Sequence, residues 1–188
     1  MKINNDLNLI IPVEREEGTI YVHAKPIGWD VFELYHRTLG AAYEALTSDG
    51  LNLVVCLATA RIALKDAAVT LDRWDGADGV KNGFLGELQR TAMVHFPTEK
   101  GWEDLMLVDA VRRGIIDEDE QREVENALVF FTLCYRMFTK DRRAKMLNAM
   151  ALVGGYQLSS SNDTEFKDSL LTLTTEESTK EAGSLIPS

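Results

Sequence analysis

A chain of 188 residues with a hydrophobic fraction of 45% is long enough to bury a core without disulfides or a structural metal. Its formal net charge of −10 disfavours nonspecific binding to nucleic acid, which needs clustered lysine and arginine, and favours partners with basic surfaces. No apolar run approaches the roughly 20 residues of a membrane helix, and the first residues lack the pattern of a secretory leader, so neither a membrane nor nucleic acid is expected as a partner.

The first predicted elements are two strands joined by a turn. Apolar side chains alternate with other residues from Leu7 to Val13, a period of two that is typical of a strand. The charged segment 14–18 ends in glycine, which adopts a positive φ at little cost, and β-branched and aromatic residues follow at 19–23. The sequence therefore predicts a β-hairpin within residues 1–26.

Helical periodicity dominates after this hairpin. Apolar positions recur at spacings of three and four over residues 29–46 and again over the alanine-rich stretch 51–71. A third helix is predicted at 80–96, where Pro97 ends it, and a fourth after Gly101. The loop at 73–79 is an ordinary turn, because it matches neither the carboxylate spacing nor the closing glutamate of a calcium loop.

The clearest predicted helix begins at Asp117. Asp117 and Glu120 stand at capping-box spacing, and the acidic run that follows suits the positive end of a helix dipole. The rest of this helix is apolar on more than one face, so it is either the central helix or one with an exposed binding face. A sixth helix at about 141–153 is predicted to end at the glycine pair that follows it.

Polarity changes near residue 157. The segment 158–188 is acidic and rich in serine and threonine, which is typical of a flexible tail, although the stretch 164–170 holds enough apolar residues to dock. We therefore divide the chain into a helical domain at 1–157 and a polar tail at 158–188. The predicted fold is mainly α, with about five to six helices, a short N-terminal β-hairpin and a disordered acidic C-terminal tail.

Histidine and cysteine follow no catalytic or metal-binding motif. His23, His36 and His95 fall in separate elements without an HxxxH, HxH or CxxC partner, although ligands can converge in space. We expect one histidine at a strand edge and two on helix surfaces. Cys56 and Cys134 lie in apolar runs, as reduced core residues do. Since GxSxG and glycine-rich phosphate motifs are also missing, we expect a protein that is not an enzyme and has no cofactor and no metal.

The aromatic run of the fifth helix is the candidate partner-binding site. Core packing is the default interpretation of such a run, but this helix has more apolar faces than one core contact uses. Phe131, Tyr135 and Phe138 share one stripe, while Phe130 and Met137 lie a step round the helix. We expect one stripe to face the core and the other to bind a helical partner or a second copy of the chain.

A series of landmarks in fixed order resembles the tail assembly chaperones of long-tailed bacteriophages and prophages. The resemblance covers nearly the whole chain, and it depends on the order of the segments more than on any one of them. The segments are IPVEREEGTIYVHAKPI at 11–27, VFELY at 31–35, GELQRTAMV at 86–94, GWE at 101–103, EVENALVFFT at 123–132 and NDTEFKDSL at 162–170.

This resemblance implies a non-enzymatic role in the host cell cytoplasm. Proteins of that family coat the tape measure protein before the tail tube polymerises on it, and they are absent from the finished virion. In many of these phages a frameshifted, longer form recruits the tail tube protein, and the polar segment beyond Ser159 fits the linker before that junction. The alternatives are an acidic inhibitor or adaptor that occupies a basic nucleic-acid-binding surface of a partner, and a small enzyme. The aromatic helix favours the chaperone, because a phosphate mimic acts through surface carboxylates.

Overall fold

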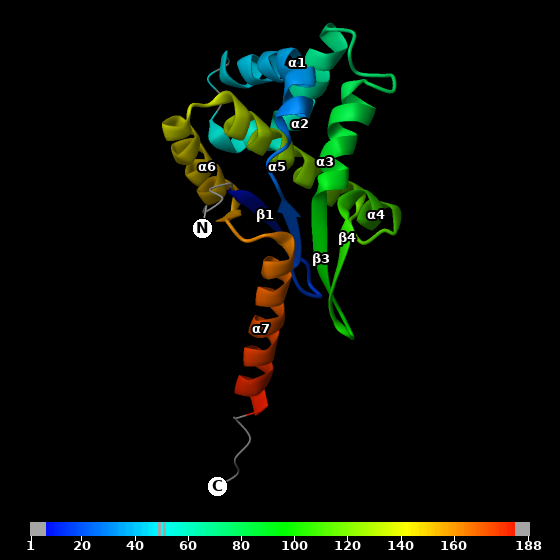
Figure 1. Ribbon diagram of the computed structural model, residues 1–188, viewed down its shortest axis with the longest axis vertical. Helices are drawn as coiled ribbons and strands as arrows, with labels where there is room; N and C mark the ends of the chain where they lie inside the picture. Colours follow the sequence, from blue (N-terminus) through cyan, green and yellow to red (C-terminus); the bar gives the residue numbers. More distant parts are fainter. Residues whose placement is uncertain (1–6, 49, 51, 183–188) are drawn as a thin grey trace.

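The computed structural model describes residues 7–48, 50 and 52–182, which form seven α-helices, one π-helical segment and five strands (Figure 1). The strands are β1 (Asn8–Val13), β2 (Ile20–Ala24), β3 (Ala92–Thr98), β4 (Gly101–Met106) and β5 (Gln157–Ser159). The helices are α1 (Trp29–Ser48), α2 (Leu53–Thr70), the π-helix η1 (Val80–Phe84), α3 (Leu85–Thr91), α4 (Leu107–Arg112), α5 (Glu118–Met137), α6 (Lys140–Gly154) and α7 (Asp163–Ala182).

The five strands form one antiparallel sheet in the order β4-β3-β2-β1-β5. β1 and β2 are the predicted hairpin, with Leu9 opposite Ala24 and Val13 opposite Ile20. β3 and β4 extend the sheet on the β2 side, while β5 returns from the other end of the chain to pair with β1. The predicted hairpin is therefore confirmed, but the fold combines a helical layer with a five-stranded sheet.

The second hairpin corrects two of the predicted helices. Of the predicted third helix only residues 80–91 are helical, and of the fourth only α4 at Leu107–Arg112, because Ala92–Thr98 and Gly101–Met106 are the strands β3 and β4. Two features explain the strands. Side chains of β3 alternate between the two sheet faces, and Gly101 has a φ of +113°, which closes the tight turn before β4. Pairing with the distant strand β2 stabilises this arrangement, and a local pattern does not reveal such pairing.

Helix ends follow the predicted signals. The Asp117 side chain accepts hydrogen bonds from the amides of Asp119 and Glu120, and the Glu120 carboxylate accepts one from the Asp117 amide, so the capping box is complete. α6 ends at a left-handed residue, Gly155, whose φ is +68°. These local signals predict the start of α5 and the end of α6 to within two residues of the observed positions.

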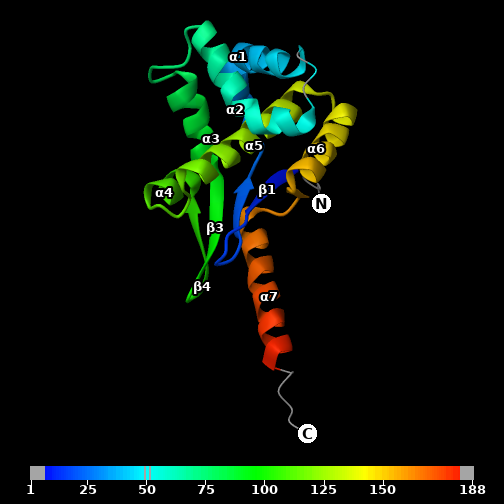
Figure 2. The same ribbon diagram turned by 180° about the vertical axis from the view of Figure 1, so that it is seen from behind.

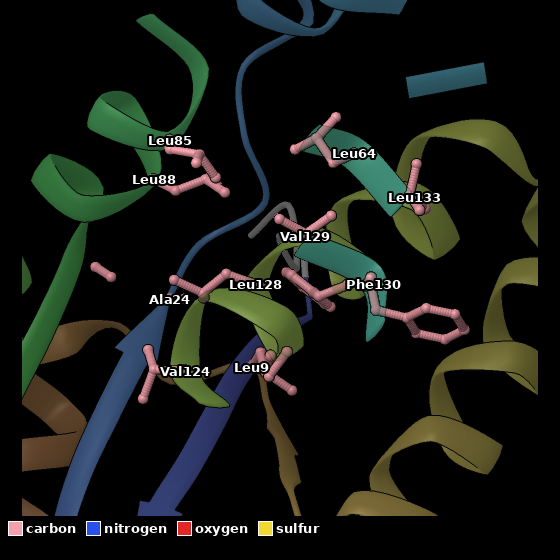
Figure 3. Packing of buried hydrophobic residues seen from close by; sticks show 14 of the residues in the cluster. Leu9, Ala24, Leu64, Leu85, Leu88, Val124, Leu128, Val129, Phe130 and Leu133 are labelled. Atoms are coloured by element: carbon pink, nitrogen blue, oxygen red, sulfur yellow. The ribbon is translucent and has the colours of Figure 1, made fainter. Parts of the chain in front are cut away.

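The two faces of the sheet are covered differently. Side chains on one face, among them Leu9 and Val22, join the helical layer in the main core, where Leu128 of α5 packs close to β1 and β2 (Figure 3). On the opposite face a small separate cluster joins Ile10 to Phe166 and Leu170 of α7. In both ribbon views α7 leaves the sheet and projects beyond the rest of the molecule (Figures 1 and 2).

The segment after residue 157 differs from the flexible tail that its composition predicts. β5 adds a fifth strand to the sheet, with Leu158 opposite Leu9. α7 then begins at Asp163, and its first turns dock on the sheet through Phe166 and Leu170, as the apolar residues of 164–170 suggest. The prediction of disorder for residues 183–188 lies outside the described residues.

Candidate partner-binding surface

The aromatic residues of α5 lie mostly inside the protein. Phe130, Phe131 and Tyr135 are buried, and Figure 3 shows Phe130 among the core side chains. Phe138 is partly buried and packs edge-to-face against Tyr43 of α1, with ring centroids 5.6 Å apart. Met137 alone of the five predicted residues is exposed, at 36%.

This placement corrects the expectation of a spare apolar face on α5. The helix contacts α1, α2, α3, α6 and strand β1, so its several apolar faces meet several neighbours at once. Of the two interpretations that its sequence allows, the structure selects the central helix. Larger exposed apolar side chains lie on other elements, α2 among them.

A buried carboxylate fixes how α5 packs against its neighbours. The Glu125 side chain is only 2% exposed, and it pairs with the Arg61 guanidinium of α2. Its other oxygen accepts hydrogen bonds from Gln89 Nε2 at 2.6 Å and from Gln121 Nε2 at 2.7 Å. Because α2, α3 and α5 all contribute donors, this network fixes the register of α2 on α5 and hence which face of α2 points outward.

The outward face of α2 carries several exposed apolar side chains. Val54, Ile62 and Val69 are 61%, 55% and 56% exposed, and Ala58 continues the same stripe at helical spacing. We call these four residues the α2 face. Lys65 also points outward, but its ammonium lies 5.7 Å from the centre of the Trp74 ring. The remaining surface of the stripe is apolar, which is unusual for side chains in contact with water.

A groove runs along one side of the α2 face. It has a volume of about 490 Å³ and lies between α1 and α2. Small side chains of α1 form one wall, namely Ala41 and Ala45, and Ile62, Ala63 and Ala67 belong to the α2 wall. Alanine lets another backbone approach closely, so the groove has the shape that a helix needs in order to pack against two others.

A second groove of about 420 Å³ lies at the N-terminal end of the α2 face, between α2, α5 and α6. Val54 and Ala58 belong to both this groove and the α2 face, and Val153 of α6 extends the apolar wall. Among the described residues, the one charged side chain lining the first groove is Asp66, and in the second it is Glu123. The potential at both grooves thus favours a partner with basic groups beside an apolar stripe.

Two of the three histidines come together on the opposite face of the sheet. His23 on β2 and His95 on β3 are 1% and 0% exposed, and both face Asp163 at the start of α7. This corrects the expectation of a strand-edge and a helix-surface histidine. His36 is exposed on α1, as expected, and its Nδ1 lies 2.7 Å from the Glu33 carbonyl oxygen.

The sequence analysis missed this cluster because it placed most of residues 92–98 in a helix instead of a strand. Once β3 is paired with β2, Tyr21 lies opposite His95, and His23 follows Tyr21 on the same face. Across the described residues, no set of three or more His, Cys, Asp or Glu side chains is arranged to hold a metal ion. Cys56 and Cys134 are both buried, which confirms their predicted place in the core.

Comparisons with known proteins give no relative. No protein-family model, no curated protein and no solved structure matches this chain. None of the helices in the described part of the chain combines the length and apolar character needed to cross a membrane.

Proposed function

We propose that this protein is a tail assembly chaperone of a long-tailed bacteriophage, which binds the tape measure protein and keeps it in solution before the tail tube forms. The observation that carries the proposal is the exposed α2 face with one groove along its side and a second at its N-terminal end. The order of the sequence landmarks supports the same function. In this proposal the tail tube protein is recruited by a longer translation product, and the work takes place in the host cytoplasm.

The mechanism is binding without chemistry. An apolar stripe of a client helix lies along the α2 face, with its flanking lysine and arginine side chains toward Asp66 and Glu123. Covering that stripe removes the surface through which long helical chains associate with one another. The acidic surface of the chaperone then keeps the complex in solution, because the net charge of −10 makes complexes repel one another.

The size of the α2 face suits reversible binding of a client helix. Val54, Ile62 and Val69 are only a little more than half exposed, so completing their burial contributes about 1–2 kcal/mol each, or roughly 3–6 kcal/mol in all before association entropy is subtracted. Two carboxylates at the groove walls add specificity more than affinity. A chaperone must leave when the tail tube polymerises, so moderate affinity at each client site, repeated along the client, matches the task.

The test is co-expression with the tape measure protein encoded in the same genome. We expect Ile62→Ser and Val69→Ser together to leave the chaperone folded, because both side chains are more than half exposed, and to shift the client from the soluble to the insoluble fraction. Met106→Ser is the matched control, since Met106 is an exposed apolar residue on β4, and its client should stay soluble.

Two results would overturn the proposal. One is a client that stays equally soluble with the wild type and with the double variant. The other is a double variant that changes the oligomeric state of the chaperone alone, which would make the α2 face a contact between copies. Loss of client binding only when Asp66 and Glu123 are replaced by Asn and Gln would instead favour an acidic adaptor.

A further inference from the structure

The first turns of α7 dock on the sheet around a polar centre. Phe166 stacks over the His23 ring at a centroid distance of 5.7 Å and meets the His95 ring edge-on at 5.4 Å. Tyr21 and Trp102 pack beside it, and Leu170 is buried one turn further along. This apolar contact is small and separate from the main core, so docking depends strongly on the polar groups beneath it.

A capping box fixes the start of α7 and thereby aims Asp163 at the two imidazoles. The Asn162 side chain accepts a hydrogen bond from the Glu165 amide at 3.0 Å, and the Glu165 carboxylate accepts one from the Asn162 amide at 2.9 Å. Asp163 is the next residue, and its Oδ1 lies 3.0 Å from His95 Nε2 and 3.6 Å from His23 Nδ1. One carboxylate oxygen therefore serves two buried rings.

The hydrogen bonds assign the proton on each ring. His23 Nε2 is 3.1 Å from the Ser161 carbonyl oxygen, which only accepts, so Nε2 carries the hydrogen and Nδ1 of the neutral ring has none. His95 donates from Nε2 to Asp163, and its buried Nδ1 has no hydrogen-bond partner among the described residues. A neutral His23 ring thus keeps its hydrogen bond to the Ser161 carbonyl in the docked state.

Burial sets the direction of the titration. Burial lowers the pKa of His23 more than the Ser161 carbonyl and Asp163 raise it, and the nearby His95 and Lys25 lower it further. Burial also raises the pKa of the Asp163 carboxyl, but the hydrogen bond from His95, together with the electrostatic effect of His95, His23 and Lys25, outweighs this, so its pKa lies below the ordinary value.

The other charged groups around α7 do not replace this contact. Lys167 of α7 pairs with Asp104 of β4 further along the helix, and both side chains are about one-third exposed. Glu165 is occupied by the capping box.

We propose that His23, His95 and Asp163 form a proton-operated latch, which holds α7 on the sheet near neutral pH and releases it in mild acid. Release returns His23 to water, where an imidazole takes up a proton below about pH 6.5, while the docked ring resists protonation. Docking is therefore fully favoured above pH 6.5 and is weakened as the pH falls below it. Released α7 uncovers an aromatic surface on the sheet around Tyr21, Ile10 and Trp102.

Hydrogen–deuterium exchange of the α7 peptides, corrected for intrinsic rates, measures the latch. When the pH is one unit below the pKa of the undocked ring, a single imidazole lowers the docking equilibrium constant by up to about tenfold. We therefore expect protection of residues 163–171 to fall several-fold, to a limit of about tenfold, between pH 7.5 and pH 5.5, relative to the central helix α5. Unchanged relative protection over this range would overturn the proposal.

His23→Gln separates protonation from packing. The Gln amide can donate to the Ser161 carbonyl but takes up no proton, so its α7 should stay equally protected at both pH values. The same pH-dependent loss in this variant as in the wild type would contradict the latch.

A second measurement tests the latch even if α7 does not dock in the His23→Gln variant. The His23 pKa, read from the pH dependence of its ring proton signal, should lie lower in the wild type than in Phe166→Ala, where α7 loses its main apolar contact. Equal values in the two proteins would overturn the proposal. Because neither measurement involves the client, a negative result for the latch does not bear on the proposed function. A negative result for the proposed function likewise does not bear on the latch.

Discussion

Arg15 and Glu120 join the N-terminal hairpin to the first turn of the central helix. Arg15 Nε donates to Glu120 Oε1 at 2.6 Å, while the other Glu120 oxygen accepts the Asp117 amide at 2.9 Å and also contacts the guanidinium. One carboxylate thereby completes a helix cap and binds a strand turn 105 residues away in sequence. The Glu120 hydrogen bond also raises the pKa of Arg15, although burial opposes it.

Replacing Glu120 by alanine removes both contacts. We expect Glu120→Ala to lower the free energy of unfolding by about 1–2 kcal/mol, the sum of a lost cap and a partly buried ion pair. Urea unfolding followed by circular dichroism measures the change. Glu118→Ala is the matched control on the same turn, because Glu118 is 80% exposed and pairs only with Arg122 among the bonds described here, so its effect should stay below about 0.5 kcal/mol. Equal effects in the two variants would contradict the role given to Glu120.

Removal of the buried Glu125 carboxylate should be more costly. Glu125→Ala leaves Arg61, Gln89 and Gln121 without their shared acceptor, so we expect a loss of about 2–3 kcal/mol in the free energy of unfolding. Glu125→Gln retains an acceptor oxygen and should lose less. Thermal and urea unfolding of the two variants compare them directly, and an alanine variant as stable as the wild type would rule out the network as a fixed contact.

Gly83 in the π-helix η1 has no room for a side chain. A Cβ added there would overlap the Tyr35 hydroxyl, which donates a hydrogen bond to the Asp78 carbonyl at 3.1 Å. We expect Gly83→Ala to cost about 1–3 kcal/mol through overpacking. Since the overlap is with the hydroxyl oxygen, the same substitution in a Tyr35→Phe background should cost clearly less. A double-mutant cycle with no coupling between the two positions would contradict this close approach.

Cys134 should be inert in the folded protein. Burial, with a smaller contribution from the neighbouring Cys56, raises its pKa to about 12, so almost no thiolate is present at pH 8. We expect a thiol reagent at pH 8 to modify Cys134 only at the rate of unfolding, and immediately in denaturant. Rapid labelling under native conditions would mean that α5 is not the central helix.

The sequence analysis succeeded where the signal is local. The capping box at Asp117, the glycine that ends α6 and the alternation of β1 are all contained within a few neighbouring residues, so a single sequence reveals them. The hairpin β3–β4 was missed because apolar residues at Leu105, Val108 and Val111 also fit a helical period. Only pairing with β2, some 70 residues earlier, decides between the two.

The candidate sites depended even more on contacts between distant segments. Two adjacent phenylalanines, Phe130 and Phe131, point to different sides of α5, and the sequence does not show that both sides are covered. His95 and Asp163 are 68 positions apart and meet only because the start of α7 docks on the sheet. The α2 face could not be predicted because its exposed residues are of the same types as core residues. Only the packing of α2 on α5 shows which of them face outward.

The central claim is that a helical client lies on the α2 face, and site-specific photo-crosslinking tests it most directly. A photoreactive phenylalanine analogue is placed at Ile62 and, as a control, at Met106, two exposed apolar positions on different elements. The proposal predicts a crosslinked product with the co-expressed tape measure protein from position 62 and none from position 106. Crosslinking from position 106 alone, or equally from both, would contradict it.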